Sequence, residues 1–437
     1  MISRIAKLSS VKRTALGLAL LAALAGGGAG AIGSFDAGAD PDLPPQDACL
    51  KTAAPTVLGA LGHVAMRVYH EGVSSERTAS ALRAITGSLP LREAVERGNA
   101  QATAAAAEAL VTSGHMTSLR VLGKGAGGSA STQVLANVGV AAALTPLSGT
   151  LTNAHGAPIA TFLASVWADN GFVIETDGIT EGAVALRENG HSIGGSFELP
   201  PGELPAQGTL SERGVAYQYT SFPAAAFPSG SLRVYLLRSI SSMRALCGPS
   251  EKSVLVHTLN RVASLIYSAE GGSRARLQVR RVQHDRALLD AVAKRDPTAA
   301  RQAIWGVLHA HTHVVRMRVS AADGSLLSDV GGPFVLAPVR APLRLHGRTV
   351  GSVVLSIQDD LGYLLLTQRL AGLDVVMSTN PKHPKLVMST LRPAPTSVPA
   401  HGAYSYRGHD YRVFTLDAKA FPAGVLRISV LIPIPYS

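Results

Sequence analysis

The sequence predicts an α/β (α+β) protein of two tandem modules, each with a long N-terminal helix and a central antiparallel sheet of about five strands. The first observation is an internal repeat. The motif Phe-Pro-x-Gly-x-Leu-Arg begins at Phe227 and again at Phe421, 194 positions later (421 − 227), with matched segments around both copies. The second is that each half starts with apolar residues at helical spacing and continues with β-branched runs between turn residues. This duplication predicts modules over residues 48–245 and 246–437.

A long helix is expected at the start of each half. Apolar residues recur at helical spacing over residues 49–76 and again from Cys247 onward. The register of the two helices is shared, because Tyr69 and Tyr267 lie 198 positions apart, as do the two cysteines. Shorter helices are expected around residues 91–95 and 288–292.

Strands and turns follow in the same order in both halves. Each half has a first strand, a hairpin at a His-Gly pair, a β-branched run, an Asp that suits helix capping before a short helix, and further strands up to the repeated motif. The matched segments are 115–121, 155–156, 159–166, 169–172 and 183–186 in the first half, and 313–319, 346–347, 350–357, 360–363 and 375–378 in the second.

Composition and charge narrow the class of partner. The 437 residues carry a net charge of +11, and aromatic residues make up 5% of them. A basic balance suits an anionic neighbour such as a membrane surface, a wall polymer or an acidic ligand. The basic residues are scattered and are not interleaved with stacking aromatics, so nucleic acid is not expected as a partner.

The N-terminus predicts the compartment. Four basic residues precede an uncharged run over residues 14–34, and the first acid is Asp36. We expect residues 1–35 to form a signal anchor that crosses the cytoplasmic membrane, or a signal peptide, followed by a Pro-rich linker over residues 36–47. The bulk of the chain then lies outside the membrane, single-pass with its N-terminus in the cytoplasm, or secreted if the leader is cleaved. No cytoplasmic output domain is expected.

The order of elements resembles the Cache superfamily of bacterial sensor modules, which are extracellular PAS-like folds. The most family-like segment is 314–379, with a turn at Asp323-Gly324, a Leu-Ala-Pro-Val step ending at Val339, and the Gly-Tyr-Leu that starts at Gly362. The resemblance covers residues 48–240 and 247–435. It implies a small ligand between each sheet and its covering loops, and a signal that passes through the N-terminal helix and the last strand.

One departure from the family concerns carboxylates. Relatives that recognise carboxylates place basic residues just before the Pro of the Pro-Val step. Here residues 334–337 and 142–144 are apolar at those positions. Carboxylate recognition by that arrangement is therefore not expected.

Polar and aromatic residues expected on the sheet faces and adjoining loops are the candidate ligand contacts. The alternative is that they are ordinary surface or core residues. The candidates are Trp167, Tyr217, Tyr219 and Arg233 in the first half, and Arg316, Arg318, Tyr363, Tyr411 and Arg427 in the second.

Catalytic and metal signatures are weak. The sequence has no Gly-x-Ser-x-Gly elbow and no His-Glu-x-x-His. Asp359 and Asp360 are adjacent, so in a strand they would point to opposite faces. His309, His311 and His313 alternate, but we expect a partly exposed polar edge rather than a metal site. No enzyme activity and no cofactor are predicted.

The two cysteines, Cys49 and Cys247, each open the first helix of a half. In a PAS-like module the first helix starts where the last strand ends, which would bring both thiols to one side of the first module. A disulfide is then possible in an oxidising compartment. The alternative is two buried, apolar cysteines kept by duplication.

Taken together, the sequence predicts an extracytoplasmic, non-catalytic protein that binds or senses an unknown small ligand and signals through a separate membrane partner. The alternative is an envelope interaction protein that binds a protein or a cell-wall polymer and has no small-molecule pocket.

Overall fold

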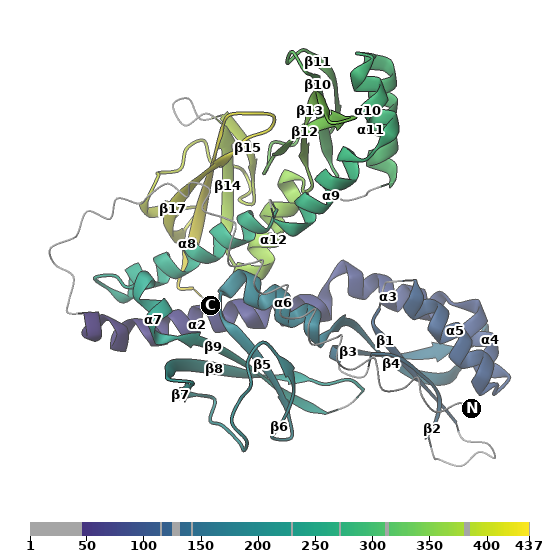
Figure 1. Cartoon of the computed structure of the whole chain (residues 1–437). Helices are drawn as coiled ribbons and strands as arrows, with labels where there is room; N and C mark the ends of the chain where they lie inside the picture. Colours follow the sequence, from purple (N-terminus) through teal and green to yellow (C-terminus); the bar gives the residue numbers. More distant parts are fainter. Residues whose placement is uncertain are drawn as a thin grey trace, which may run out of the picture. The chain divides into compact units, whose positions relative to one another are not determined.

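The computed structural model repeats one order of elements: in the described part of each half, four helices, four strands, one helix and five strands (Figure 1). A short α-helix, α7 (Ile240–Met243), and a short 3-10 helix, η1 (Arg244–Leu246), separate the copies. The structure describes residues 46–113, 116–124, 132–140, 143–228, 230–270, 272–310, 314–379 and 385–436.

The first half runs from α2 to β9. Its elements are α2 (Gln46–Ser74), α3 (Glu76–Gly87), α4 (Leu89–Glu96), α5 (Ala100–Thr112), β1 (Ser118–Lys124), β2 (Thr132–Gly139), β3 (Ala143–Thr152), β4 (Pro158–Ala168), α6 (Asp169–Thr180), β5 (Ala183–Glu188), β6 (His191–Gly195), β7 (Gln207–Glu212), β8 (Val215–Ala225) and β9 (Ser231–Ser239).

The second half runs from α8 to β18. Its elements are α8 (Glu251–Glu270), α9 (Ser273–Gln283), α10 (Arg286–Ala293), α11 (Pro297–Ala310), β10 (Arg316–Ala321), β11 (Leu326–Gly331), β12 (Val339–Leu345), β13 (Arg348–Ser356), α12 (Asp360–Ala371), β14 (Asp374–Thr379), β15 (Lys385–Ser389), β16 (Gly402–Tyr406), β17 (His409–Lys419) and β18 (Val425–Ile434).

The strands form four antiparallel sheets, which confirms the predicted α/β class. The four-stranded sheets have the orders β2-β1-β4-β3 and β11-β10-β13-β12. The five-stranded sheets have the orders β6-β5-β9-β8-β7 and β15-β14-β18-β17-β16. Both halves therefore share one topology, and in each the repeated Phe-Pro motif leads into the central strand of the five-stranded sheet.

Each half has two sheets, where the sequence predicted one central sheet of about five strands. The helix after the β-branched run, α6 or α12, separates the two sheets. Several strands also lack the alternation that marks a strand in sequence. In β7 no residue is buried, and in β6 all five residues are at least partly exposed. Their pairing with neighbouring strands is a tertiary feature that local patterns do not show.

Matching contacts confirm that the two halves are structural copies. The hydroxyl of Tyr69 accepts the N–H of Ala225 at 2.8 Å, and that of Tyr267 accepts the N–H of Lys419 at 3.1 Å. Gly331 shows why a glycine is required at the end of β11: its φ is 121°, and a Cβ there would collide with a backbone carbonyl. Its counterpart at the end of β2 has the same left-handed backbone and the same collision.

Several helix starts have a side-chain cap, whereas α6 starts after Ala168 without one, so Asp169 is not its cap. The side chains of Ser75, Asn99 and Asp285 accept first-turn backbone N–H groups at α3, α5 and α10. At α12 the cap is Asp359, whereas Asp360 is buried and accepts the N–H of Val335 from another segment at 3.1 Å. The adjacent aspartates thus have two structural roles.

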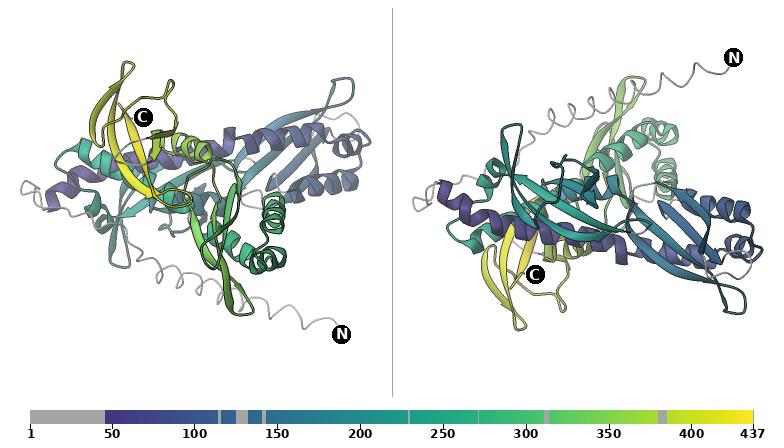
Figure 2. Two further views of the ribbon diagram at one scale, coloured as in Figure 1. Left: turned by 90° about the horizontal axis from the view of Figure 1, so that it is seen from above. Right: turned by 90° about the horizontal axis from the view of Figure 1, so that it is seen from below.

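The largest hydrophobic cluster, the central cluster, joins the two halves. It contains buried side chains of α2, α6, α8 and α12 and one face of each five-stranded sheet. Helix α2 contacts α8, α12 and strands β8 and β9 (Figure 2). Each half also has one smaller cluster, which lies between its four-stranded sheet and the helices that precede that sheet. The boundaries of the two predicted modules stay a prediction.

Among the described residues, none of the helices combines the length and the hydrophobicity that a membrane span requires. The predicted anchor or signal peptide over residues 1–35 lies outside the described residues, as does most of the predicted linker.

Candidate functional site

A hollow of about 440 Å³ lies on the outer face of the first five-stranded sheet, which faces away from the central cluster. The loop between β6 and β7 covers this face and inserts Leu199 among buried residues of the sheet. Polar and apolar groups share the wall of the hollow. They are Arg187, Asn189, Gly190, Glu203, Leu204, Pro205, Ala206, Pro223, Ser231, Leu232, Arg233 and Tyr235.

Two arginines, Arg187 and Arg233, line the hollow, and a tight turn follows the strand that carries Arg187. Asn189 and Gly190 have φ values of 49° and 79°, the left-handed pair that a two-residue hairpin turn needs, and they join β5 to β6. Arg187 stands just before this turn in β5 and is only 4% exposed. Its Nη1 and Nη2 donate to the carbonyls of Gly202 and Pro200 in the covering loop. Arg187 therefore attaches that loop to the sheet.

The second arginine is the direct cross-strand neighbour of the first. Arg187 of β5 pairs with Arg233 of β9, so both side chains lie on the same face of the sheet. Arg233 is half-buried, and its Nη1 donates to Ser221 Oγ at 3.0 Å. Tyr235 is two residues further along β9, with its ring centroid 5.9 Å from Arg187 Cζ and its hydroxyl donating to the Leu204 carbonyl at 3.4 Å.

No carboxylate of the described residues balances the charge of this pair. Among the described residues no carboxylate lies within ion-pair distance of Arg187 or Arg233, and Glu203, which also lines the hollow, is exposed. Arg187 Nε is buried and has no hydrogen-bond partner in the described part of the chain. A buried polar group without a partner costs folding free energy. The hollow can therefore accept a negatively charged group.

The sequence candidates of the first half lie in two places. Tyr217, Tyr219 and Arg233 share the outer face of the sheet, and Arg233 lines the hollow. Tyr217 packs on Phe197 with ring centroids 4.9 Å apart, and Tyr219 is buried, which raises the pKa of its phenol. Trp167 lies elsewhere, between two hydrophobic clusters.

The candidates of the second half do not form one site. Arg316 makes a bidentate pair with Asp329 at 3.0 and 3.1 Å and lies over the ring of Phe421 with Cζ 4.3 Å from its centroid. Arg318 lies 3.8 Å from the same carboxylate. Tyr363 is buried in the central cluster.

The last two candidates, Tyr411 and Arg427, lie on the outer face of the second five-stranded sheet. Burial, then the charge of Asp374 and a hydrogen bond to it, raise the pKa of Tyr411. Arg427 Nε lies 3.8 Å from Asp417 Oδ1. A ligand role for either residue stays a prediction.

Sequence reasoning missed Arg187 and Tyr235. One signal was present in the sequence. Arg187 follows the apolar run 183–186 near the end of β5, and the matching strand of the second half has Ser378 there, opposite Arg427. A search for charged residues present in only one copy of the repeat would have found it.

A second hollow, of about 390 Å³, lies between α4 and α5. Alanines supply half of its wall, and its two charged residues, Glu93 and Arg97, lie 3.8 Å from each other. It offers a ligand few specific contacts.

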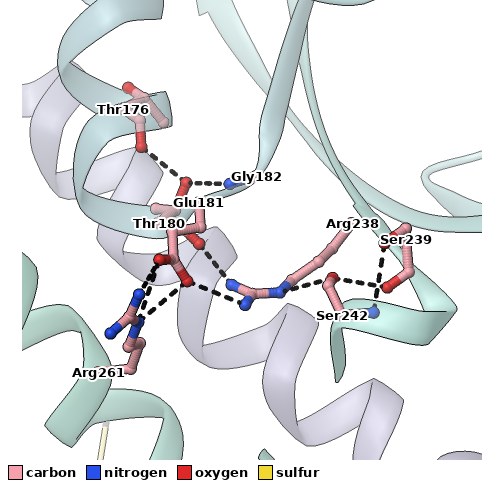
Figure 3. A network of polar contacts seen from close by, with 8 residues as sticks. All are labelled: Thr176, Thr180, Glu181, Gly182, Arg238, Ser239, Ser242 and Arg261. Atoms are coloured by element: carbon pink, nitrogen blue, oxygen red, sulfur yellow. Dashed lines mark hydrogen bonds and ion pairs between the residues drawn. The ribbon is translucent and has the colours of Figure 1, made fainter. Parts of the chain in front are cut away.

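A polar network joins the same five-stranded sheet to the second half (Figure 3). Arg238, on the inner face at the end of β9, donates to the Thr180 carbonyl at 2.6 Å and lies 3.3 Å from Glu181 Oε2. Arg261 of α8 binds the same carboxylate through Nε, at 3.1 Å from both oxygens, and through Nη2. Burial acts to raise the pKa of Glu181, but the hydrogen bonds and charges of Arg261 and Arg238 outweigh it and lower that pKa.

Cys247 is disulfide-bonded in the structure. The side chain of Cys49 is outside the described part of the chain, so the predicted pairing stays a prediction. The described residues contain no group of three or more His, Cys, Asp or Glu side chains that could hold a metal ion, and His311 and His313 are outside them.

Comparisons with known proteins give no family. No protein-family model matches the sequence, and no curated protein matches it. Two solved structures of the periplasmic domain of LuxQ from Vibrio cholerae are 17% and 16% identical, over 39% of this chain and 97% and 96% of theirs, each with a TM-score of 0.26. An extracellular ligand binding receptor from Desulfohalobium retbaense is 10% identical over 53% of this chain and 47% of its own, with a TM-score of 0.22. These TM-scores are too low to establish a shared fold.

Proposed function

We propose that the chain is a non-catalytic protein that binds and senses a small molecule outside the cytoplasmic membrane, and that a separate membrane partner carries the signal. The observation that carries the proposal is the hollow on the first five-stranded sheet. It is about 440 Å³, within the range of small-molecule sites, and it combines apolar walls with a few convergent polar groups.

The covering loop supports a binding role. Arg187 holds the loop through two carbonyls, and Tyr235 holds it through a third. A molecule in the hollow would contact both the loop and the sheet, so binding would change how firmly the loop is attached. This is the arrangement of a site that encloses a ligand between a sheet and its covering loop.

Strand β9 supports a sensing role. It carries Arg233 in the wall of the hollow and, five residues later, Arg238 in the network with Glu181 and Arg261. A shift of β9 on ligand binding would therefore act on α8, the first helix of the second half. Such coupling needs an element with two arrangements, and β9 with its network is the proposed one.

A thermal-shift screen of the full-length chain in detergent tests the proposal. The compounds are amino acids, organic acids, amines and sugars, and each hit is titrated by calorimetry. A ligand that binds only the native state raises its stability by about 2.7 kcal/mol at 100 times its Kd. A screen of these classes in which no compound raises the melting temperature would reject small-molecule binding and favour the alternative of an envelope interaction protein.

A further inference from the structure

The two copies of the repeat differ in charge at one structural position. In the second half, β14 places Ser378 directly opposite Arg427 of β18. In the first half, the same register places Arg187 opposite Arg233. The first half thus has two cations where the second has one.

The second cross-strand neighbour of each arginine also differs between the halves, and here it is the second half that has the additional charge. Arg427 is paired across β17–β18 with Asp417, whose Oδ1 is 3.8 Å from Arg427 Nε. Arg233 is paired across β8–β9 with Pro223. The first half therefore lacks the carboxylate that lies near the arginine in the second half, where Asp417 is 65% exposed and Arg427 Nε has no hydrogen-bond partner among the described residues.

This arrangement costs folding free energy unless an anion is bound. Like charges directly opposite in an antiparallel pair destabilise a sheet. Arg187 is 4% exposed, so its charge is poorly hydrated; two carbonyls compensate in part, and its Nε has no partner among the described residues. Arg233 is more accessible, and its described side-chain partner is the hydroxyl of Ser221.

We infer that the hollow binds a small organic carboxylate whose carboxyl group takes the place that Asp417 occupies in the second half. This inference rests on the proposed function and names the ligand class. Arg233 contacts the carboxylate, and Arg187 supplies the second positive charge and holds the covering loop. The planar guanidinium fork matches a carboxylate.

The remaining wall favours an organic acid over an inorganic anion. Leu204, Pro205 and Pro223 line the hollow beside the arginines. These side chains offer contacts to the carbon skeleton of a ligand and none to a free phosphate or sulfate. The apolar residues 334–337 of the second half, at positions where the carboxylate-binding proteins of the resembled family carry basic residues, are not part of this hollow.

The test compares acids with their neutral amides on the full-length chain in detergent. The probes are benzoate, succinate, glutamate and citrate, with benzamide, succinamide and inorganic phosphate, and binding is measured by calorimetry. We expect at least one acid to bind and its amide to bind at least about 10-fold more weakly. Added salt should weaken the binding of the acid, because it screens the attraction between the charges.

Matched variants locate the site. Arg233→Gln is expected to weaken acid binding about 10-fold to 100-fold, whereas Arg213→Gln, at an arginine whose side chain is 90% exposed and does not line the hollow, leaves it unchanged. Arg233→Lys keeps the charge but loses the fork, so its loss is smaller. Circular dichroism and the unliganded melting temperature confirm that each variant folds.

Failure of this inference is distinct from failure of the proposed function. The carboxylate is rejected if an amide binds as tightly as its acid, if only phosphate or a neutral compound binds, or if folded Arg233→Gln binds like wild type. In each of those results small-molecule binding itself still stands. If none of these probes and no compound of the wider screen binds, both are rejected.

Discussion

Replacing Glu181 by Gln removes the one negative charge that Arg238 and Arg261 share, and so tests the contact between the two halves (Figure 3). The side chain of Arg238 is 5% exposed, that of Glu181 33% and that of Arg261 42%. Gln keeps the size of the side chain and can still hydrogen-bond one arginine. The variant therefore removes charge with little change in packing.

The expected loss of stability follows from these exposures. Removing one partner of a fully buried ion pair costs about 3–5 kcal/mol. Here Glu181 is one-third exposed, and Arg238 keeps its bonds to the Thr180 carbonyl and to Ser242 Oγ. We therefore expect Glu181→Gln to lower the free energy of unfolding by about 1.5–3 kcal/mol, the range for hydrogen bonds to charged groups.

The assay is guanidinium denaturation of the full-length chain in detergent, followed by circular dichroism. Glu212→Gln is the matched control, because Glu212 lies 3.4 Å from Arg213, whose side chain is 90% exposed. A surface pair contributes at most about 1 kcal/mol, so the control should change little. Equal losses in the two variants would show that the charge of Glu181 does not stabilise the contact between the two halves.

The pH dependence gives an independent check. The folded-state pKa of Glu181 lies below its usual value of 4.5. The stability that its charge contributes is therefore present above pH 4.5 and lost as the pH falls through the folded-state pKa. The difference between wild type and Glu181→Gln should shrink in that acidic range, and a difference that stays constant with pH would mean that charge is not its cause.

Two further predictions concern the repeat and the cysteines. Tyr69→Phe and Tyr267→Phe each remove a hydroxyl that accepts a backbone N–H. Each change should lower the free energy of unfolding, measured by denaturation, by about 0.5–1.5 kcal/mol. No loss in either variant would contradict the equivalent role of the two tyrosines. Peptide mass spectrometry of non-reduced protein should find Cys49 linked to Cys247, and reduction should cost about 4–5 kcal/mol in the chain-entropy model. Two free thiols, or Cys247 linked between two chains, would contradict that pairing.

Part of the candidate site was predictable from sequence. Arg233 was identified because it recurs with its surroundings at Arg427, and it does line the hollow. Arg187 was not, because its importance depends on which residue faces it across β5 and β9. Tyr235 reads in sequence as an ordinary strand aromatic, and only the fold of the covering loop brings the Leu204 carbonyl to its hydroxyl.

Sequence signals alone predicted the duplication, the long helix that starts each copy, the short helix after the β-branched run, and the place of the Phe-Pro-x-Gly motif just before the last strand of each copy. These follow from local signals, because apolar periodicity, turn residues and caps act within a few residues of each other. The tertiary structure alone decided that each half has two sheets, that the halves share one hydrophobic cluster, and that two arginines meet at a hollow. Strand pairing and burial join positions far apart in the chain, so the charge balance at Arg187 becomes visible only when the strands are paired.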